Sequence, residues 1–305
     1  MDPRAQLAEA HAVGRAVTTG GIEQVRAQAL AQVRRSMGMT DAPPPPCTDP
    51  ELAYIAPDSV VRRIHGDLPS MLIGGLSALL FQMLHPLAMA GVAQFSNYRS
   101  DPLGRLERTA GFLGTTTFGT RTEAREAIAR VRRVHGHVRG VAPDGRSYSA
   151  TDPDLLTWVH AAEVSSFLAA ARAYAPHPPT GPEADDYLDR MAGVALDLGA
   201  VDPPRSEAAL KAYFTSVRPL LRFTPEARDA RNFVLRGVGR WPHEVATYGL
   251  LVSAARGILP AWARRQLRLP ALPAGDLLAV RPSARLLGSA FRWVATPPRV
   301  VEPAT

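Results

Sequence analysis

The sequence predicts an all-α protein with a single multi-helix main domain. Three observations support this prediction. Apolar residues recur at helical spacing over long stretches, N-capping residues precede many of these stretches, and few segments alternate between apolar and polar residues as strands do. The chain has 305 residues, of which 46% are hydrophobic, so it is long enough to bury a sizeable core.

The charged residues exclude several classes of protein. The formal net charge is +7, and almost all of the excess is arginine, because Lys211 is the only lysine. Lys211 follows a leucine, so no phosphate-binding loop of the glycine-lysine type and no protein-kinase motif set is present. Cys47 is the only cysteine, which excludes intrachain disulfides and C-x-x-C motifs. This composition is typical of a reduced, cytoplasmic protein.

The arginine surplus has three possible explanations. Arginine can neutralise nucleic-acid phosphates, it can bind the carboxylates or phosphates of a ligand, or it can reflect a bias of the whole chain towards Ala and Arg. DNA-binding patches usually contain lysine as well, so its near absence argues against a nucleic-acid partner. Compositional bias remains the simplest explanation for most of these residues.

Composition divides the chain into three parts. Residues 1–56 are expected to form an N-terminal helical segment and a proline-rich linker, since Pro43–Pro46 make a rigid break. Residues 57–270 carry dense helical patterns, and residues 271–305 form a Pro- and Arg-rich tail expected to lie on the surface. The first residues show no basic segment followed by an apolar run, so no signal peptide is expected.

The first helices of the main domain are apolar. Asp58 or Ser59 is expected to cap a helix through Ile64. The stretch 68–98 then contains no Asp, Glu, Lys or Arg, which raises the question of a membrane span. His85 and the proline after it interrupt the stretch, and its apolar run is shorter than the ~20 residues that a spanning helix needs. We therefore expect a buried central helix that is kinked or ends near His85, and no transmembrane span.

Capping signals place the next elements. Asp101-Pro102 predicts a helix through Thr109, followed by a segment that three glycines interrupt. Thr120 with Glu123 has the capping-box pattern and predicts a helix from about 121 to 139, closed by Gly140. The segment 141–150 contains Asp-Gly and predicts a turn or short hairpin. A helix then starts at Asp152 and runs to about 174. Further helices are expected over residues 183–198, 206–217, 225–236, 242–256 and 260–267.

One helix face carries residues that could bind a cofactor. Arg132, His135 and Arg139 stand at i, i+3 and i+7, and His135 falls on the apolar stripe of its helix. A lone histidine there is commonly a core residue. An imidazole between two guanidinium groups, however, also suits haem, because it could bind the iron while the arginines bind the propionates. Arg105 and Thr109, one turn apart, could together bind one carboxylate, although exposed arginines with this spacing are common.

The remaining histidines give no metal motif. The sequence contains eight histidines but no H-E-x-x-H and no pair at i, i+4, so a zinc site is not expected. His85 and His160 are expected to be core residues, with a supporting role near the site as the alternative.

Several motifs together resemble the family of bacterial rubber oxygenases (latex clearing proteins) and fungal MpaB-type oxygenases. The similar segments are LLFQMLHPLAMAGVAQFS, DPLGRLERTAGFL, VRRVHGHVRG, and Tyr148 with TDPDLLTWVHAAEVSSFL. Two later fragments, from Pro204 to Tyr213 and ILPAWAR, fit more loosely. The resemblance covers roughly residues 57–265, and the order of the motifs makes it specific for the family but not for one activity.

The resemblance implies an all-helical domain that binds haem b without covalent attachment. It implies that His135 is the proximal ligand of the iron, that Arg105 and Thr109 line the haem site, and that Arg132 and Arg139 flank the ligand. Rubber oxygenases can have a lysine next to the motif threonine, and the residue here is Arg108. A guanidinium stays protonated and is a poor iron ligand, so the distal side is expected to be open or to hold water.

The resemblance also implies a function. We expect an oxygenase-like enzyme that uses haem b and O2 on a small apolar substrate, with Thr109 and Arg108 on the distal side. Polyisoprene cleavage is not expected, because the stretch 68–98 contains no acidic residue and no export signal is visible. The alternatives are a haem carrier or sensor without turnover, a basic helical nucleic-acid binder, and a peroxidase-like enzyme. The carrier would use the same residues as the oxygenase.

Overall fold

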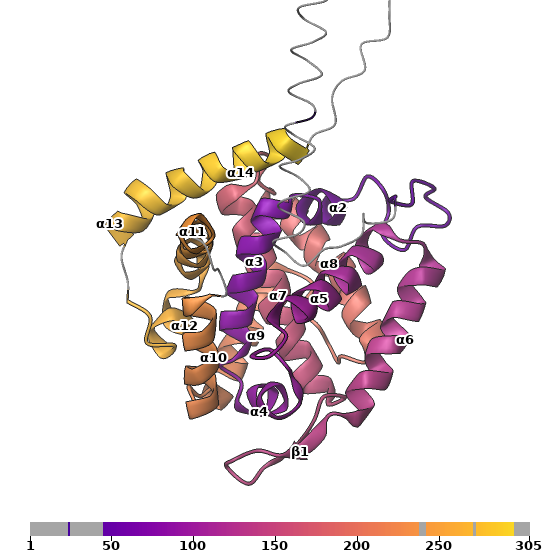
Figure 1. Ribbon diagram of the computed structural model, residues 1–305. Coiled ribbons are helices and arrows are strands. Elements are labelled where there is room, and N and C mark those ends of the chain that lie inside the picture. Colours follow the sequence, from indigo (N-terminus) through magenta and orange to yellow (C-terminus); the bar gives the residue numbers. More distant parts are fainter. Residues whose placement is uncertain (1–23, 25–44, 238–241, 271–272, 296–305) are drawn as a thin grey trace, which may run out of the picture. The chain divides into compact units, whose positions relative to one another are not determined.

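The computed structural model describes residue 24 and residues 45–237, 242–270 and 273–295, and it confirms the all-α prediction (Figure 1). Residues 45–288 belong to one compact unit. The helices are α2 (Val60–His65), α3 (Leu68–Gln82), α4 (Pro86–Phe95), α5 (Pro102–Phe118), α6 (Arg121–His137), α7 (Pro153–Tyr174), α8 (Gly181–Leu198), α9 (Glu207–Val217), α10 (Pro225–Arg236), α11 (Pro242–Ile258), α12 (Ala261–Gln266), α13 (Pro273–Gly275) and α14 (Arg281–Ala295). Short turns, η1 (Arg218–Leu220) and η2 (Asp276–Val280), and a hairpin of β1 (Arg139–Val141) and β2 (Ser147–Ser149) complete the list.

The core is built around α3 and α7, which pack along their lengths (Figure 1). Gly74 permits this close approach, because a Cβ atom there would lie 2.7 Å from the ring of Phe167 and 3.1 Å from its Cα. At the other end of the pair, Trp158 is fully buried and donates from Nε1 to the carbonyl of Gln82 at 3.1 Å. The apolar, uncharged sequence of α3 thus fills the centre of the domain.

The uncharged stretch bends where the sequence predicts it. α3 ends at Gln82 and α4 begins at Pro86, and the two helices make an angle of 107°. A proline in the first turn suits the start of a helix but cannot continue the previous one, which explains the break. Within the described residues, no single helix is long and apolar enough to cross a membrane, whereas the bent pair α3–α4 meets the length and composition criteria together.

The predicted capping residues are confirmed at four helices. Ser59 caps α2 and Asp101 caps α5, where its carboxylate accepts from the amide of Gly104 at 3.0 Å. Thr120 and Glu123 form both bonds of the capping box at the start of α6, and Asp152 caps α7. These side chains satisfy amide groups that have no partner inside the helix.

The prediction that glycines interrupt the helix after Thr109 was wrong, because α5 continues to Phe118. A glycine inside a helix costs about 1 kcal/mol relative to alanine, which tertiary packing can offset. Thr116 and Thr117, which follow the interior glycines, are both buried in the domain. Packing of this last turn therefore explains why the helix persists.

The predicted end of the next helix was also wrong. α6 ends at His137, and Arg139 already belongs to β1, where it pairs with Ser149. The amide of Ala150 donates to the carbonyl of Val138 at 2.8 Å, so pairing with the returning strand replaces the last helical turn. The predicted hairpin is confirmed, and Gly145 occupies its turn with a φ of +84°, a conformation that favours glycine.

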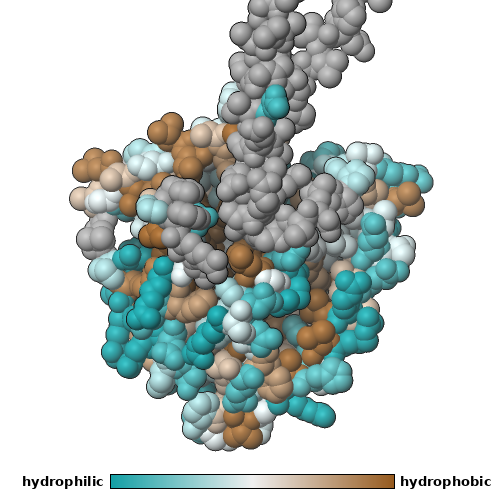
Figure 2. All heavy atoms as spheres, viewed as in Figure 1, coloured by the Kyte–Doolittle hydropathy of each residue, from teal (hydrophilic) through white to brown (hydrophobic). Residues whose placement is uncertain are grey.

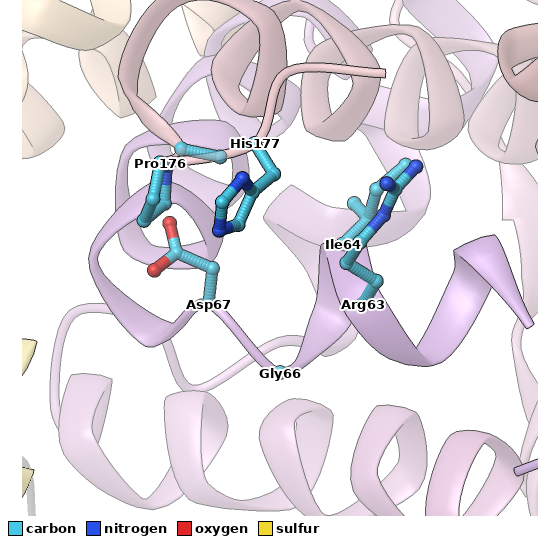
Figure 3. A pocket seen from close by; sticks show the side chains of 7 residues that line it. Arg63, Ile64, Gly66, Asp67, Pro176 and His177 are labelled. Carbon is cyan, nitrogen blue, oxygen red and sulfur yellow. The ribbon is translucent and has the colours of Figure 1, made fainter. Parts of the chain in front are cut away.

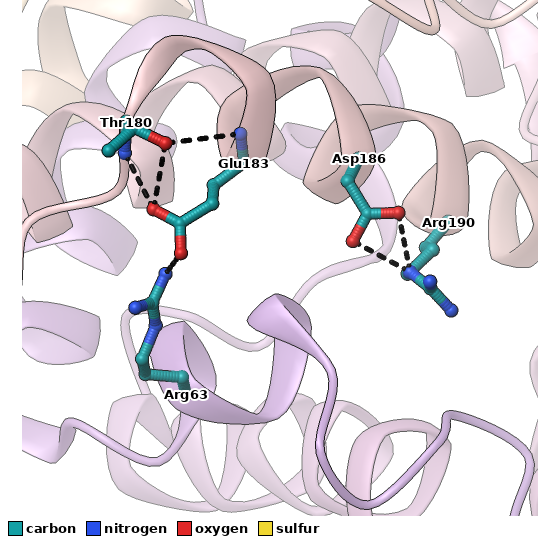
Figure 4. A network of polar contacts seen from close by, with 5 residues as sticks. All are labelled: Arg63, Thr180, Glu183, Asp186 and Arg190. Carbon is teal, nitrogen blue, oxygen red and sulfur yellow. Dashed lines mark hydrogen bonds and ion pairs between the residues drawn. The ribbon is translucent and has the colours of Figure 1, made fainter.

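A polar network fixes the start of α8 to α2 (Figure 4). Glu183 accepts from the amide and the hydroxyl of Thr180 in a capping box and also forms an ion pair with Arg63 of α2. One turn further along α8, Asp186 pairs with Arg190 at 2.8 Å. The predicted helices of the second half are all present, as α8 to α12, within a few residues of their expected bounds.

The C-terminal part is helical where we expected a proline- and arginine-rich tail. α14 covers Arg281–Ala295, and its Ala284 and Gly288 are buried. Arg285 donates from Nε to the carbonyl of Ala173 at the end of α7, at 2.9 Å. Small residues at helical spacing thus dock this helix, a pattern that the high Pro and Arg content hides. The helix expected within residues 1–40 lies outside the described residues except for Gln24.

Candidate functional site

Arg105 and Thr109 lie on one face of α5, as predicted. Arg105 is half-buried and donates from Nη1 to the hydroxyl of Ser96, the residue that caps the C-terminus of α4, at 2.9 Å. Burial lowers the pKa of this guanidinium from its usual value, and the charge of Arg108 adds to the effect. The hydroxyl of Thr109 donates back to the carbonyl of Arg105 at 3.0 Å. Arg105 thus joins α4 to α5.

Arg108 faces solvent at the same end of α5. Its side chain is 66% exposed, and it forms an ion pair of 3.3 Å with Asp101, the residue that caps this helix. Such an exposed pair contributes little to stability. The ion pair keeps Arg108 beside the N-terminus of α5.

His135 ends the buried stripe of α6. Ala124 and Ile128 are buried on this stripe, and His135 continues it at the C-terminal turn, where the helix becomes half-buried. Within the described residues, no group forms a hydrogen bond with its imidazole. Burial lowers the pKa of His135, so the ring is neutral at physiological pH. A neutral imidazole with a free ring nitrogen is the form that binds a metal.

The two flanking arginines have different surroundings. Arg132 is exposed and donates from Nη1 to the carbonyl of Asp197 on α8, at 3.3 Å. Arg139 is also exposed but belongs to β1. The helical spacing from which we placed Arg139 on the His135 face therefore does not apply, and its position depends on the hairpin instead.

The hairpin that carries Arg139 packs against α4. Tyr148 donates from its hydroxyl to Gln94 Oε1 at 2.6 Å, and Gln94 donates from Nε2 to the carbonyl of Val141 at 3.1 Å. Gly91 of α4 faces Tyr148, because a Cβ atom there would lie 3.4 Å from its ring. These contacts connect the residues after His135 to the helix whose end binds Arg105. α5, α6 and the hairpin thus carry the six predicted site residues, and α4 contacts both α5, through Arg105, and the hairpin.

His85 and His160 are buried, as expected for core residues. His85 Nδ1 and His160 Nε2 have no hydrogen-bond partner among the described residues, and burial lowers the pKa of each ring to about 4. The His85 ring lies 6.0 Å from that of Trp158. Both rings are therefore neutral at physiological pH.

Sequence reasoning missed a polar cluster on the inner side of α7. Glu163 is the only Asp, Glu, Lys or Arg between Asp154 and Arg172, and this isolation in an apolar run was the signal that could have revealed it. Burial raises the pKa of Glu163 to about 7, and its charge raises the pKa of Tyr187 on α8, which burial already raises. The Tyr187 hydroxyl lies 3.0 Å from His65 Nε2. This cluster lies outside the set of predicted site residues.

A surface pocket lies apart from the predicted residues. It has a volume of about 210 Å³ and lies between the α2–α3 connection and the residues after α7 (Figure 3). Asp67 and His177 face each other across it. Its lining residues are Arg63, Ile64, Gly66, Asp67, Ala175, Pro176 and His177. None of the six predicted site residues contributes to it.

Comparison with known families identifies the chain. A family model described as "ER-bound oxygenase mpaB/B'/Rubber oxygenase, catalytic domain" matches residues 62–293. The chain belongs to this family. The match confirms the resemblance inferred from the sequence motifs, and it makes the chain an oxygenase-type enzyme domain. It also extends beyond residue 265, where the motif resemblance ended, and includes most of α14. Neither the comparison with curated proteins nor the comparison with solved structures gave a match.

Proposed function

We propose that the protein is a haem b-dependent oxygenase that acts on a small apolar organic substrate, with His135 as the iron ligand. The observation that carries this proposal is the state of His135. It lies on the inner stripe of α6, half-buried and neutral, and no group of the described residues forms a hydrogen bond with it. Neither ring nitrogen of His135 is a buried atom, so the imidazole is open to a ligand, and an iron bond would give it the partner that no group of the described residues provides.

The three predicted arginines suit the two propionates of haem by their chemistry. Arg105, Arg132 and Arg139 form no ion pair with any described carboxylate, and their side-chain bonds, where present, go to a hydroxyl or a carbonyl group. Arg105 is the most informative, because a half-buried guanidinium without a carboxylate favours an anionic ligand. The residues present therefore fit a porphyrin with two carboxylates. Within the described residues, no three His, Cys, Asp or Glu side chains gather as a metal site, and haem requires only one axial histidine.

The chain's own residues would bind and orient the haem and would keep water out of the site. Haem, when bound, supplies the chemistry that activates O2. His135 would hold the iron from one side, and the arginines would fix the orientation of the ring. The Thr109 hydroxyl, which donates to the carbonyl of Arg105, would have to turn away from that carbonyl to donate to a bound ligand. Arg108 would contribute positive charge near the bound group but no iron ligand, since a guanidinium has no lone pair to offer.

Apolar helices would border the proposed haem site. The stretch that forms α3 and α4 contains no acidic or basic residue. Such a wall suits an apolar substrate and keeps water from the reactive centre. The proposal of a small apolar substrate depends on this wall together with the oxygenase family.

The test is reconstitution with haem. The wild type is expected to show a Soret band, and a pyridine haemochrome assay should identify haem b. His135→Ala should abolish or strongly weaken this band. His137→Ala is the matched control, because His137 is on the same turn of α6 and is exposed, and this variant should keep the band. A colourless wild type, or loss of haem in His85→Ala but not in His135→Ala, would contradict the assignment.

Catalytic consumption of O2 distinguishes an oxygenase from a haem carrier. The haem-loaded protein should consume O2 when a reductant and a library of small apolar compounds are supplied. Haem binding without O2 or peroxide consumption would instead identify a carrier or sensor.

A further inference from the structure

α14 exposes apolar side chains on the face opposite to its docked one. Ala284 and Gly288 are buried against the domain. Leu278, Pro282 and Leu286 are all exposed and stand at i, i+4 and i+8, which places them on one face along η2 and α14. Leu278 is 81% exposed and Leu286 is 73% exposed. We call these three residues the α14 ridge.

This exposure is unusual within the described chain. The two ridge leucines are the most exposed of its large hydrophobic residues, and the others range from 37% to 58% exposed. Hydrophobic atoms reach the surface at the upper left of Figure 2, where Figure 1 places α13 and the first turns of α14. Apolar side chains gathered on one exposed helix face are a candidate interaction site.

Arginines lie beside the ridge. Arg285 is exposed, and the bond from its Nε to the carbonyl of Ala173 holds the base of the guanidinium against the domain. Arg281 lies one turn earlier and pairs with Asp276, the only acidic residue of η2 and α14. The ridge therefore lies in a region of net positive charge, on a chain whose net charge is +7.

We propose that the α14 ridge docks this protein on the surface of an anionic lipid bilayer. A helix with exposed leucines and adjacent arginines lies in the plane of the interface, where the leucines enter the acyl boundary and the arginines reach the lipid phosphates. The ridge is one helix wide, whereas a stable protein interface buries about 800 Å² on each partner. A planar bilayer needs only such a shallow strip. This inference goes beyond the oxygenase proposal and does not depend on haem.

The test is co-sedimentation of the full chain with lipid vesicles. One set contains phosphatidylcholine alone, and the other also contains phosphatidylserine. The wild type should bind the phosphatidylserine vesicles, and added salt should weaken this binding because salt screens the arginines. The ridge variant Leu278→Glu/Leu286→Glu should bind about tenfold more weakly or not at all.

A charge-matched control distinguishes the contribution of the ridge leucines to vesicle binding from that of the overall positive charge. Leu196→Glu/Leu220→Glu changes the charge by the same amount at two other exposed leucines, which are 41% and 52% exposed. This variant should bind within about twofold of the wild type if the ridge supplies the apolar contact. Equal loss in both double variants would overturn the proposal, as would a wild type that does not bind vesicles. A wild type that elutes as a dimer, with the ridge variant monomeric, would instead assign the ridge to a second copy of the chain.

Discussion

The Nδ1 atom of His65 lies 2.7 Å from the hydroxyl of Thr117, which joins α2 to the last turn of α5. The opposite ring nitrogen lies 3.0 Å from the hydroxyl of Tyr187, so one buried imidazole joins three helices. All three side chains are buried. Because buried polar groups without partners are costly, this triad constrains the relative positions of the helices that enclose the core.

Thr117→Val should therefore destabilise the protein. The variant keeps the shape of the side chain but leaves a ring nitrogen of His65 without its partner, which costs about 1–3 kcal/mol. Urea denaturation measures the change. Thr115→Val is the control, since Thr115 is half-buried in the same turn and its hydroxyl forms no bond within the described residues, and its effect should stay below about 0.5 kcal/mol. Equal losses in the two variants would show that the His65 contact contributes no stability.

Three buried histidines predict loss of stability in mild acid. Burial lowers the pKa of His65, His85 and His160 to about 4, whereas an unfolded histidine titrates near 6.5. As the pH falls from 6.5 to 4, the unfolded chain binds protons that the native protein excludes. Stability should therefore be greatest above pH 6.5 and should decrease by up to about 3 kcal/mol per histidine towards pH 4. Urea denaturation midpoints measured between pH 6.5 and pH 4 test this. Midpoints that stay constant over this range would contradict the prediction.

The contribution of Glu163 to the stability of the protein has the opposite pH dependence. Burial raises its pKa to about 7, so above pH 4.5 the unfolded chain releases a proton that the native protein retains. Its contribution to stability is present below pH 4.5 and is lost as the pH rises to 7. Glu163→Gln should consequently stabilise the protein above pH 7, by about 3 kcal/mol at most, and have little effect at pH 4.5. Melting temperatures at the two pH values give the comparison, and destabilisation at both would indicate that the carboxylate has a partner.

The sequence predicted the helices wherever a local signal defined them. Asp101, Thr120 and Asp152 are short-range capping signals, and each begins a helix where expected. The end of α6 depends instead on pairing with a strand that follows later in the chain, which helical spacing cannot indicate. That non-local contact is why Arg139 was placed on the wrong element.

The candidate site was predictable only in part. The helical stripe of α6 singled out His135 as a candidate and the i, i+4 spacing singled out Arg105 and Thr109; the structure confirms their positions on these helix faces, and their roles stay predictions. The partner of Arg105 is Ser96, which lies at the end of a different helix, and no spacing rule connects the two. Similarly, the charge interaction of Glu163 with Tyr187 depends on the packing of α7 against α8.

Two glycines in helices should respond to alanine in opposite ways. At Gly193 of α8, no atom lies within 4 Å of the place that an added methyl group would occupy, so Gly193→Ala should stabilise the protein by about 0.5–1 kcal/mol through helix propensity. At Gly74 the same methyl group would meet the Phe167 ring and backbone. Gly74→Ala should therefore destabilise by about 1–3 kcal/mol, because α3 must move away from α7. Thermal unfolding of both variants tests the prediction, which would be wrong if Gly74→Ala were also stabilising.

Arg105 is expected to control how firmly haem is held, if the proposed function is correct. Its half-buried guanidinium has a hydroxyl partner and no carboxylate among the described residues, so a propionate would gain a charge-assisted bond there. Arg105→Gln should weaken haem binding by about tenfold, since such a bond contributes about 1.5–3 kcal/mol. The rate of haem transfer to an excess of a scavenger protein measures this loss. Arg130→Gln, at an exposed position of α6, is the control and should match the wild type. If both variants release haem at the wild-type rate, Arg105 does not contact a propionate, and its bond to Ser96 serves only to join α4 to α5.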